Sequence, residues 1–287
     1  MSEREWTVTE ILTTTTDFLG RKDPSCPRLE AELLLSQVLN LERVKLYVNF
    51  DRRLTTRELS AYRELVRRRA SHEPVAYILG RKEFYRLNLT VTPQTLIPRP
   101  ETEHLVDEAL RLIKESGLTE PELADLGCGS GAVALALAAN APGAKIEAVD
   151  LSAEALAVAR ANAQALSLAD RITFSQGDLF APLSERLFDL ICANLPYVPD
   201  AELVRLPPDV ALFEPRLALA GGPEGLDVIA RLLTQAPSHL KPGGRVVLEI
   251  WPPSLLRATE LAAAAGLTPL EPVLDYAKKD RIFVAQL

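Results

Sequence analysis

Residues 122–140 read "ELADLGCGSGAVALALAAN", and this stretch decides the fold class. A short apolar run ends at Leu126, a loop with three glycines follows, and an alanine-rich helical pattern begins directly after it. Gly127, Gly129 and Gly131 lack a Cβ atom where the backbone must turn tightly and approach a ligand. A strand, a glycine loop and a helix in this order predict the first part of a βαβ unit with a ligand at the loop.

Short apolar segments alternate with helical segments through the rest of the chain, which predicts a mostly parallel sheet covered by helices on both faces. We therefore expect a Rossmann-like α/β domain. In such a sheet, ligands bind beyond the carboxyl ends of the strands, so the last residues of each strand are the candidates for the site. The further strands are expected in "KIEAVDL" (145–151), "RITFSQGDL" (171–179), "FDLICANL" (188–195) and "GRVVLEI" (244–250).

The second predicted strand ends at Asp150, nineteen residues after Gly131. A carboxylate at this position can accept hydrogen bonds from both hydroxyls of a ribose. The loop and the acid together predict a site for a cofactor that contains a nucleoside. They do not select the cofactor, because with Ala132 the loop also satisfies the dinucleotide pattern G-x-G-x-x-[GA]. A tight turn followed by a surface aspartate is the alternative.

The third predicted strand ends in "QGDLF" (176–180). Asp178 could accept a hydrogen bond from an adenine amino group, and Leu179 could pack against the adenine ring. Taken alone, the pair is more typical of an ordinary strand end than of a binding site. Its position at the same edge of the sheet is what makes it a candidate.

The fourth predicted strand ends in "NLPY", residues 194–197. The side-chain oxygen of Asn194 and the backbone carbonyl of Leu195 can each accept one N–H of a planar NH2 group. Pro196 fixes the local backbone, and Tyr197 offers a flat face to an amide or a base. A strand-terminating turn is the alternative for this tetrapeptide in isolation.

A site that holds both hydrogens of an NH2 group suits methyl transfer better than hydride transfer. The lone pair of an amide nitrogen is delocalised, and fixed acceptors raise its electron density and direct it toward an electrophile. Attack on a sulfonium methyl then depends mainly on positioning and electrostatics. The tetrapeptide therefore favours S-adenosylmethionine over NAD as the cofactor.

The first part of the chain has a different pattern. Up to about residue 78 apolar residues recur at helical spacing, and "EFYRLNLTVTPQTLIP" (83–98) then alternates like two short strands. We expect an N-terminal helical domain over residues 1–78 and a methyltransferase domain over residues 79–287. Residues 79–97 would form the linking hairpin, and "RPETEHLVDEALRLI" (99–113) has the pattern of a helix start.

Composition excludes several functional classes. The net charge of −7 and the sequence pI of about 5.2 argue against stable, sequence-independent nucleic-acid binding. No apolar run approaches the roughly 18 residues that span a membrane, and the polar start "MSEREWTVTE" is not a secretion signal. We expect a soluble, cytoplasmic monomer. No metal site is expected from the spacing of the cysteines and histidines, which are Cys26, Cys128, Cys192, His72, His104 and His239.

The sequence resembles the release factor glutamine methyltransferase family, also called the PrmC or HemK family, over nearly its whole length. The order of the matching blocks is specific, and "IPRPETE" ahead of the glycine loop is the most telling of them. The blocks are "EAELLLSQVL", "EPVAYILGRKEFY", "LIPRPETEHLV", "DLGCGSG", "FDLICANLPYVP", "FEPRLALAGGPEGLD", "KPGGRVVLEI" and "DRIFVAQ".

The resemblance implies transfer of a methyl group from S-adenosylmethionine to the side-chain amide nitrogen of a glutamine. In the family this glutamine lies in the Gly-Gly-Gln motif of peptide chain release factors, and the methylation serves translation termination. The helical N-terminal domain would help to hold the release factor. Residues 194–197 would bind the glutamine. The cofactor would be held by Gly127, Cys128, Gly129, Ser130, Gly131, Asp150, Asp178, Leu179 and Asn194.

The chain departs from the family pattern at three positions. The family usually has Asn-Pro-Pro-Tyr, whereas Leu195 stands here at the second place, where its carbonyl can still act as an acceptor. Arg86 and Trp251 stand where glycine is usual, and Trp251 could narrow the cofactor pocket or simply pack.

An alternative function follows from the same tetrapeptide. Asn-Leu-Pro-Tyr also occurs in adenine-N6 methyltransferases of ribosomal RNA, and the adenine amine is as flat as a glutamine amide. These enzymes carry their helical domain after the catalytic domain, which is the reverse of the order here. A DNA adenine methyltransferase would need a target-recognition region, which is not evident in the sequence.

Overall fold

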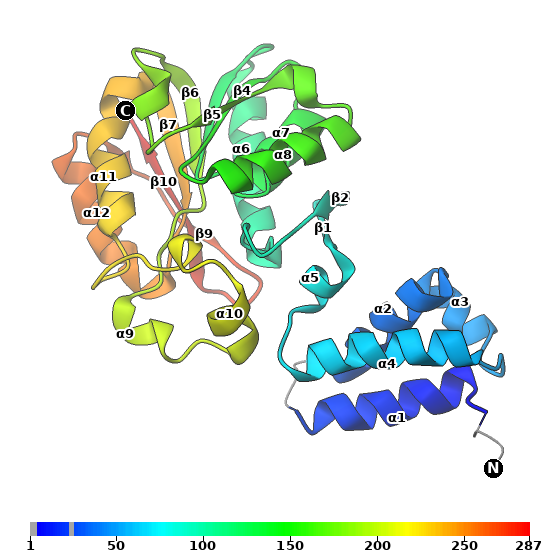
Figure 1. The fold of residues 1–287 in the computed structure, drawn as a ribbon. Coiled ribbons are helices and arrows are strands. Elements are labelled where there is room, and N and C mark those ends of the chain that lie inside the picture. Colours follow the sequence, from blue (N-terminus) through cyan, green and yellow to red (C-terminus); the bar gives the residue numbers. More distant parts are fainter. Residues whose placement is uncertain (1–4, 23–25) are drawn as a thin grey trace. The chain divides into compact units, whose positions relative to one another are not determined.

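The computed structural model describes residues 5–22 and 26–287, and its contacts divide the chain into two compact units (Figure 1). One unit comprises the described part of Met1–Gly80 together with Pro208–Phe213. The other comprises Arg81–Pro207 and Glu214–Leu287. The sequence pattern placed a division after residue 78. Residues 1–4 of the polar start lie outside the described residues.

The first unit is helical, as its apolar spacing predicts. Two of its helices begin with a capping box, in which Thr7 pairs with Glu10 and Thr55 pairs with Glu58. The core of the unit is built around the fully buried Tyr62, whose hydroxyl donates to the carbonyl of Ala31. The helices are α1 (Val8–Gly20), α2 (Pro27–Leu39), α3 (Arg43–Val48), α4 (Thr56–Ala70), α5 (Val75–Leu79) and, from later in the chain, α10 (Pro208–Phe213).

The second unit begins with the hairpin that the alternating pattern predicts. Strands β1 (Arg81–Phe84) and β2 (Leu87–Thr90) pair antiparallel, and two residues connect them. Both connecting residues have positive φ, 47° at Tyr85 and 63° at Arg86. This is the backbone of a tight hairpin turn, which glycine adopts most easily. The turn explains why glycine is usual at this position, and Arg86 adopts the same left-handed backbone.

The central sheet is mostly parallel, which confirms the predicted fold class. Its strands lie in the order β5-β4-β3-β6-β7-β10-β8, and β9 also pairs with β10. The first five are parallel to one another, whereas β10 runs antiparallel to β7. The strands are β3 (Glu122–Leu126), β4 (Lys145–Asp150), β5 (Ile172–Gln176), β6 (Phe188–Ala193), β7 (Leu240–Glu249), β8 (Thr268–Pro269), β9 (Val273–Leu274) and β10 (Asp280–Gln286).

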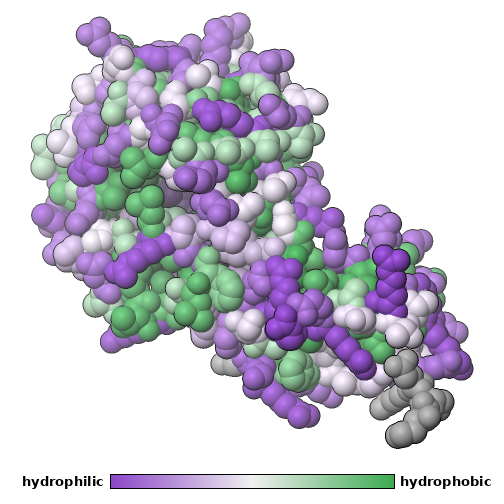
Figure 2. Space-filling model, in the orientation of Figure 1, coloured by the Kyte–Doolittle hydropathy of each residue, from purple (hydrophilic) through white to green (hydrophobic). Residues whose placement is uncertain are grey.

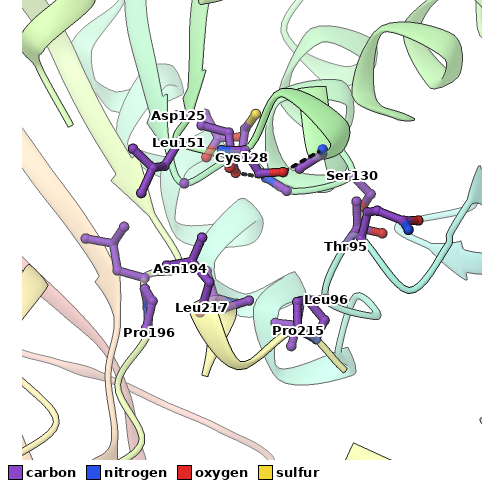
Figure 3. Close-up of a pocket in the computed structure, with 18 of the residues that line it drawn as sticks. Thr95, Leu96, Asp125, Cys128, Ser130, Leu151, Asn194, Pro196, Pro215 and Leu217 are labelled. Atoms are coloured by element: carbon purple, nitrogen blue, oxygen red, sulfur yellow. Dashed lines mark hydrogen bonds between the residues drawn. The ribbon is translucent and has the colours of Figure 1, made fainter. Parts of the chain in front are cut away.

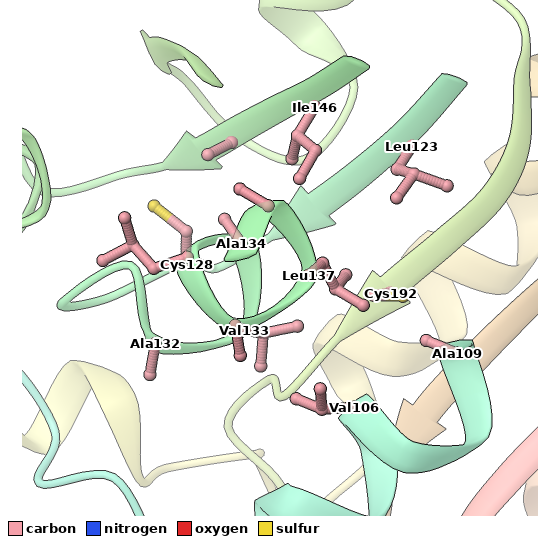
Figure 4. Packing of buried hydrophobic residues seen from close by; sticks show 14 of the residues in the cluster. Val106, Ala109, Leu123, Cys128, Ala132, Val133, Ala134, Leu137, Ile146 and Cys192 are labelled. Carbon is pink, nitrogen blue, oxygen red and sulfur yellow. The ribbon is translucent and has the colours of Figure 1, made fainter. Parts of the chain in front are cut away.

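Helices cover both faces of this sheet (Figure 1), and a separate apolar core lies between the sheet and the helices on each face. On one face, side chains of β3, β4 and β6 meet those of α6 and α7, among them Val106, Leu137 and Cys192 (Figure 4). The helices are α6 (Glu103–Ser116), α7 (Ala132–Asn140) and α8 (Ala153–Ala165) on this face, α11 (Asp227–Gln235) and α12 (Leu255–Ala264) on the other, and the short α9 (Asp200–Leu203).

Hydrophilic residues cover much of the surface in view, with apolar groups between them (Figure 2). One apolar group lies over the α9 part of the second unit. Val204, which directly follows α9 in the sequence, is exposed. None of the helices in residues 5–22 and 26–287 is long and apolar enough to span a membrane. The same residues contain no cluster of acidic, histidine and cysteine side chains that could hold a metal ion.

Candidate active site

The carboxyl ends of three strands meet at one edge of the sheet. Leu126, the last residue of β3, lies beside Val149 of β4 and beside Ala193 of β6. β4 and β5 lie on one side of β3, whereas β6 and β7 lie on its other side, so the strand order reverses at β3 and its end is the point where such folds bind ligands. A cavity of about 540 Å³ opens there, within the size range of small-molecule sites. Figure 3 shows Asp125, Cys128, Ser130 and Asn194 around it.

The glycine loop forms one wall of the cavity and needs its glycines. Gly127, Gly129 and Gly131 have φ of 75°, 54° and 81°, in the left-handed region that side chains disfavour. A Cβ atom on Gly127 would come within 2.9 Å of the Leu195 Cδ2 atom. A Cβ atom on Gly129 would meet no atom within 4 Å, so the loop faces open space there. The loop therefore leaves room for a ligand against its backbone.

Cys128 and Ser130 complete the loop and line the same cavity. The Cys128 side chain is buried, and burial raises the pKa of its thiol well above the ordinary value, so this cysteine stays protonated. The backbone N–H of Cys128 donates to the carbonyl of Val149, which ties the loop to β4. Both residues shape the loop through the backbone.

Asn162 of α8 connects the loop to the hairpin, a contact that the sequence analysis missed. Its Nδ2 donates to the carbonyls of Ser130 at 2.9 Å and Thr90 at 3.0 Å, and its Oδ1 accepts the Thr90 N–H at 2.8 Å. The side chain is buried. One amide therefore fixes the position of the hairpin relative to the glycine loop.

We predict that Asn162→Leu lowers the free energy of unfolding by about 2–3 kcal/mol, because backbone groups of Ser130 and Thr90 lose their partners in a buried place. Chemical denaturation measures the change. Gln164→Leu, on the exposed side of the same helix, is the matched control and should change stability by less than about 0.5 kcal/mol. Equal effects of the two substitutions would contradict this role of Asn162.

Asp150 lies beside the loop at the end of β4, as the sequence predicts for a ribose-binding acid. Its Oδ2 accepts the Gly129 N–H at 2.8 Å, and its Oδ1 accepts the Ser152 N–H at 2.9 Å. Burial raises the pKa of this carboxyl, and these backbone donors oppose the rise. Each oxygen keeps a further lone pair, so the carboxylate can still accept ligand hydroxyls.

Asp125, the first residue of the loop motif, is a second acid in the cavity wall and was not among the predicted site residues. It is fully buried, and its Oδ2 accepts the Ala134 N–H of α7 at 3.0 Å. Burial raises the pKa of Asp125 to about 7; the Ala134 N–H lowers it, and the charge of Asp150 raises it.

We predict that Asp125→Asn flattens the pH dependence of stability. The folded-state pKa of about 7 lies above the ordinary value of 3.8, so between these values the folded protein holds a proton that the unfolded chain has lost. The contribution of the Asp125 carboxyl to the free energy of unfolding is therefore fully present below pH 4 and is lost as the pH rises through 7. Melting temperatures of the cofactor-free protein at pH 5 and pH 8 should therefore differ less in the variant. Equal melting-temperature differences in the original protein and in Asp125→Asn would contradict the raised pKa of Asp125.

The third strand end carries Asp178 and Leu179, and both line the cavity. Leu179 is buried, in position to contact a ring. The Asp178 carboxylate pairs with Arg231 of α11, which also lines the cavity and which the sequence analysis missed. An adenine amine would share this carboxylate with the guanidinium.

The fourth strand end brings Asn194, Leu195 and Pro196 to the cavity from β6. The Asn194 Nδ2 donates to the hydroxyl oxygen of Thr102 at 3.0 Å, which leaves the amide oxygen as its acceptor for a ligand. The Leu195 side chain is only 5% exposed and packs in the core on the α11–α12 face of the sheet. Leucine here supplies packing against the glycine loop, which the sequence pattern did not indicate.

Tyr197 does not line the cavity, unlike its three neighbours. Its hydroxyl donates to the Oε1 of Glu249 at 2.8 Å, and burial together with that carboxylate raises the pKa of the phenol. A Cβ atom on Gly225 would lie 2.3 Å from the Tyr197 carbonyl oxygen. A glycine is therefore required at position 225, where the Tyr197 backbone passes close by. The flat face that we expected Tyr197 to offer is not at the cavity wall in this structure.

The opposite wall comes from two segments that lie far apart in the sequence. Leu96 and Pro98 precede α6, and Pro215 and Leu217 precede α11 (Figure 3). Glu214 joins the segments, because its carboxylate pairs with Arg99 and accepts the Ile97 N–H at 3.2 Å. This contact gives a structural role to the quoted blocks "LIPRPETEHLV" and "FEPRLALAGGPEGLD". Trp251 is half-buried outside the cavity lining, so it does not narrow the cavity.

Known families match both parts of the chain. The PrmC N-terminal domain matches residues 10–80, and the methyltransferase small domain matches residues 103–205. The release factor glutamine methyltransferase of Rhodopirellula baltica is 41% identical, over 99% of this chain and 98% of the relative. The chain belongs to the release factor glutamine methyltransferase family. The release factor glutamine methyltransferase of Geobacter sulfurreducens is 45% identical, over 85% of this chain and 84% of the relative.

Solved structures agree with the fold of this family member. A methyltransferase from Pyrococcus furiosus aligns with a TM-score of 0.53 at 18% identity, over 70% of this chain and 88% of that one. The hMettl16 catalytic domain, solved with an RNA hairpin, aligns with a TM-score of 0.56 at 17% identity, over 78% and 81%. At these identities the likeness shows the fold alone. The family match, together with this fold, identifies the chain as an S-adenosylmethionine-dependent methyltransferase.

Proposed function

We propose that this chain transfers a methyl group from S-adenosylmethionine to the side-chain amide nitrogen of the glutamine in the Gly-Gly-Gln motif of peptide chain release factors. The observation that carries the proposal is the orientation of Asn194. Its NH2 group is bound to Thr102, so its oxygen is the acceptor available at the cavity. An acceptor of this kind suits the N–H of a planar amide.

The cavity residues fit the cofactor. The open space at Gly129 lets a ligand lie against the loop backbone, and Asp150 keeps acceptor capacity for two ribose hydroxyls. Leu179 offers an apolar surface to the adenine, and Asp178 an acceptor for its amine. When bound, S-adenosylmethionine supplies an electrophilic methyl group on a sulfonium.

The residues at the end of β6 would orient the substrate amide. The Asn194 oxygen accepts one N–H of the glutamine, and the carbonyl of Leu195 accepts the other. Both acceptors increase the electron density on the amide nitrogen and hold its lone pair in one direction. No strong base is needed before the transfer, because the methylated nitrogen is acidic enough to lose its proton to water afterwards. We also propose that Asn194 contacts the cofactor, because its backbone carbonyl oxygen would lie only 3.8 Å from a Cβ atom on Gly127 of the loop.

Two separate features of the chain are proposed to bind the release factor. We propose that the helical unit recognises the protein substrate and that the exposed Leu217 at the cavity contacts the chain beside the glutamine. We also propose that the enzyme acts as a monomer in the cytoplasm, with no stable nucleic-acid partner. The acidic net charge of −7 supports a protein substrate over ribosomal RNA or DNA, the substrates of the alternative adenine-N6 activity.

A substrate panel tests this function. The purified enzyme receives S-adenosylmethionine with a radioactive methyl group, together with a release factor, ribosomal RNA or duplex DNA. We expect label in the release factor only. A release factor with Gly-Gly-Asn in place of Gly-Gly-Gln is the matched control and should stay unlabelled. Label in adenine, with none in the release factor, would establish the alternative activity instead.

A further inference from the structure

The "IPRPETE" block contains a buried hydroxyl that the proposed mechanism does not yet use. Thr102 is only 3% exposed, although it lies between Glu101 and Glu103 at the start of α6. It borders the cavity, and its oxygen accepts the Asn194 Nδ2–H at 3.0 Å. The helix-start pattern of residues 99–113 gave no role to this threonine.

Glu249 is the second unused group, a carboxylate that is 1% exposed at the end of β7. Its Oε2 accepts the Thr102 hydroxyl at 2.6 Å, and its Oε1 accepts the Tyr197 hydroxyl at 2.8 Å. Arg281 and Glu101 are the further charged groups that act on it. A carboxylate this deeply buried is retained at a cost in desolvation, which its two hydroxyl donors offset.

The direction of the hydrogen bonds follows from the chemistry of the three groups. Burial raises the pKa of the Glu249 carboxyl, and the hydroxyls of Thr102 and Tyr197 lower it. The Thr102 hydroxyl donates its single proton to the Glu249 Oε2 at 2.6 Å. The Thr102 oxygen is then an acceptor toward Asn194, and only the NH2 end of that amide can meet it. The amide oxygen is consequently left for the substrate. A threonine without this partner could donate to the Asn194 oxygen, and the amide would then present its NH2 group instead.

We propose that Thr102 and Glu249 are positioning residues that set the amide orientation of Asn194, and that Glu249 also fixes the position of Tyr197. This inference rests on the proposed glutamine methylation. In the proposed role, the pair does not act directly on the reacting nitrogen or the methyl group. The pair acts through Asn194. It turns the side-chain oxygen of Asn194, rather than its NH2 group, toward the place where the substrate N–H binds.

Two substitutions at Thr102 test the pair. Thr102→Val keeps the shape and removes the hydroxyl, whereas Thr102→Ser keeps the hydroxyl. We expect Thr102→Val to lower kcat about 30-fold, with KM for the release factor and Kd for S-adenosylhomocysteine changed less than about threefold. Thr102→Ser should keep kcat within about threefold of the original enzyme. A role in packing alone would not separate these two variants in kcat while both bind the cofactor normally.

Several outcomes would overturn the proposal. An unchanged kcat in Thr102→Val would overturn it. Equal losses of kcat in Thr102→Val and Thr102→Ser would overturn it as well. If Thr102→Val does not fold, Glu249→Gln decides, because its NH2 group forces one of the two hydroxyls to accept instead of donate. A kcat lowered about tenfold or more supports the pair, and an unchanged kcat overturns it. Failure of the proposed function is a separate result, since the unsubstituted enzyme would then not methylate the release factor.

Discussion

Asn194→Ala should lower kcat for release factor methylation by about 10³-fold, while the Kd for S-adenosylhomocysteine stays within about threefold. The side-chain oxygen of Asn194 is the acceptor that the hydrogen bond to Thr102 leaves for the substrate. Removing one preorganised group from the reacting centre typically reduces kcat by 10²–10³-fold. We propose that the cofactor is held mainly by the glycine loop and Asp150, which the substitution does not touch.

Two measurements separate the effects of Asn194→Ala. Single-turnover methylation gives the rate of the chemical step, and titration calorimetry gives the cofactor Kd. Asn88→Ala, an exposed asparagine of the hairpin, is the matched control and should leave both unchanged. A variant that loses cofactor affinity but keeps its single-turnover rate at saturation would show that Asn194 holds the cofactor rather than the substrate.

Asp150→Ala should show the opposite pattern, with a Kd for S-adenosylmethionine raised about 10²-fold. Each hydrogen bond from a ribose hydroxyl to this carboxylate contributes about 1.5 kcal/mol or more, and 1.4 kcal/mol corresponds to a factor of ten in Kd. The substitution also removes the acceptor of the Gly129 N–H, so the loop loses a contact as well.

Graded variants make the Asp150 experiment specific. Asp150→Asn keeps one acceptor oxygen and should give an intermediate Kd. Asp170→Ala removes an exposed acid outside the cavity lining and serves as the control with an unchanged Kd. An Asp150→Ala protein that binds S-adenosylmethionine as tightly as the original would remove the ribose assignment.

Much of the fold follows from local pattern. The glycine loop, the acid at Asp150 and the alternation of strands and helices predict a parallel sheet, because each is a short-range feature that the sequence displays directly. The same rule locates the site, since parallel strands bring their carboxyl ends to one edge. Asn194 was therefore found from its position at a strand end.

Contacts between distant segments could not be predicted in this way. Thr102 meets Asn194 across 92 residues and Glu249 across 147, and Asp178 meets Arg231 across 53. Periodicity indicates which face of an element is buried, but it does not identify the side chain that lies opposite. For the same reason Tyr197 was expected at the cavity, whereas its hydroxyl binds a buried carboxylate.

The central claim is that the methyl group goes to a glutamine amide nitrogen, and tandem mass spectrometry of the methylated release factor tests it most directly. The release factor is incubated with the enzyme and S-adenosylmethionine that carries a deuterated methyl group, and is then digested. We predict one deuterated methyl on the glutamine of the Gly-Gly-Gln peptide, and none when Asn194→Ala replaces the enzyme. A methyl group on another residue, or an unmodified Gly-Gly-Gln peptide beside a methylated adenine in added ribosomal RNA, would contradict the account.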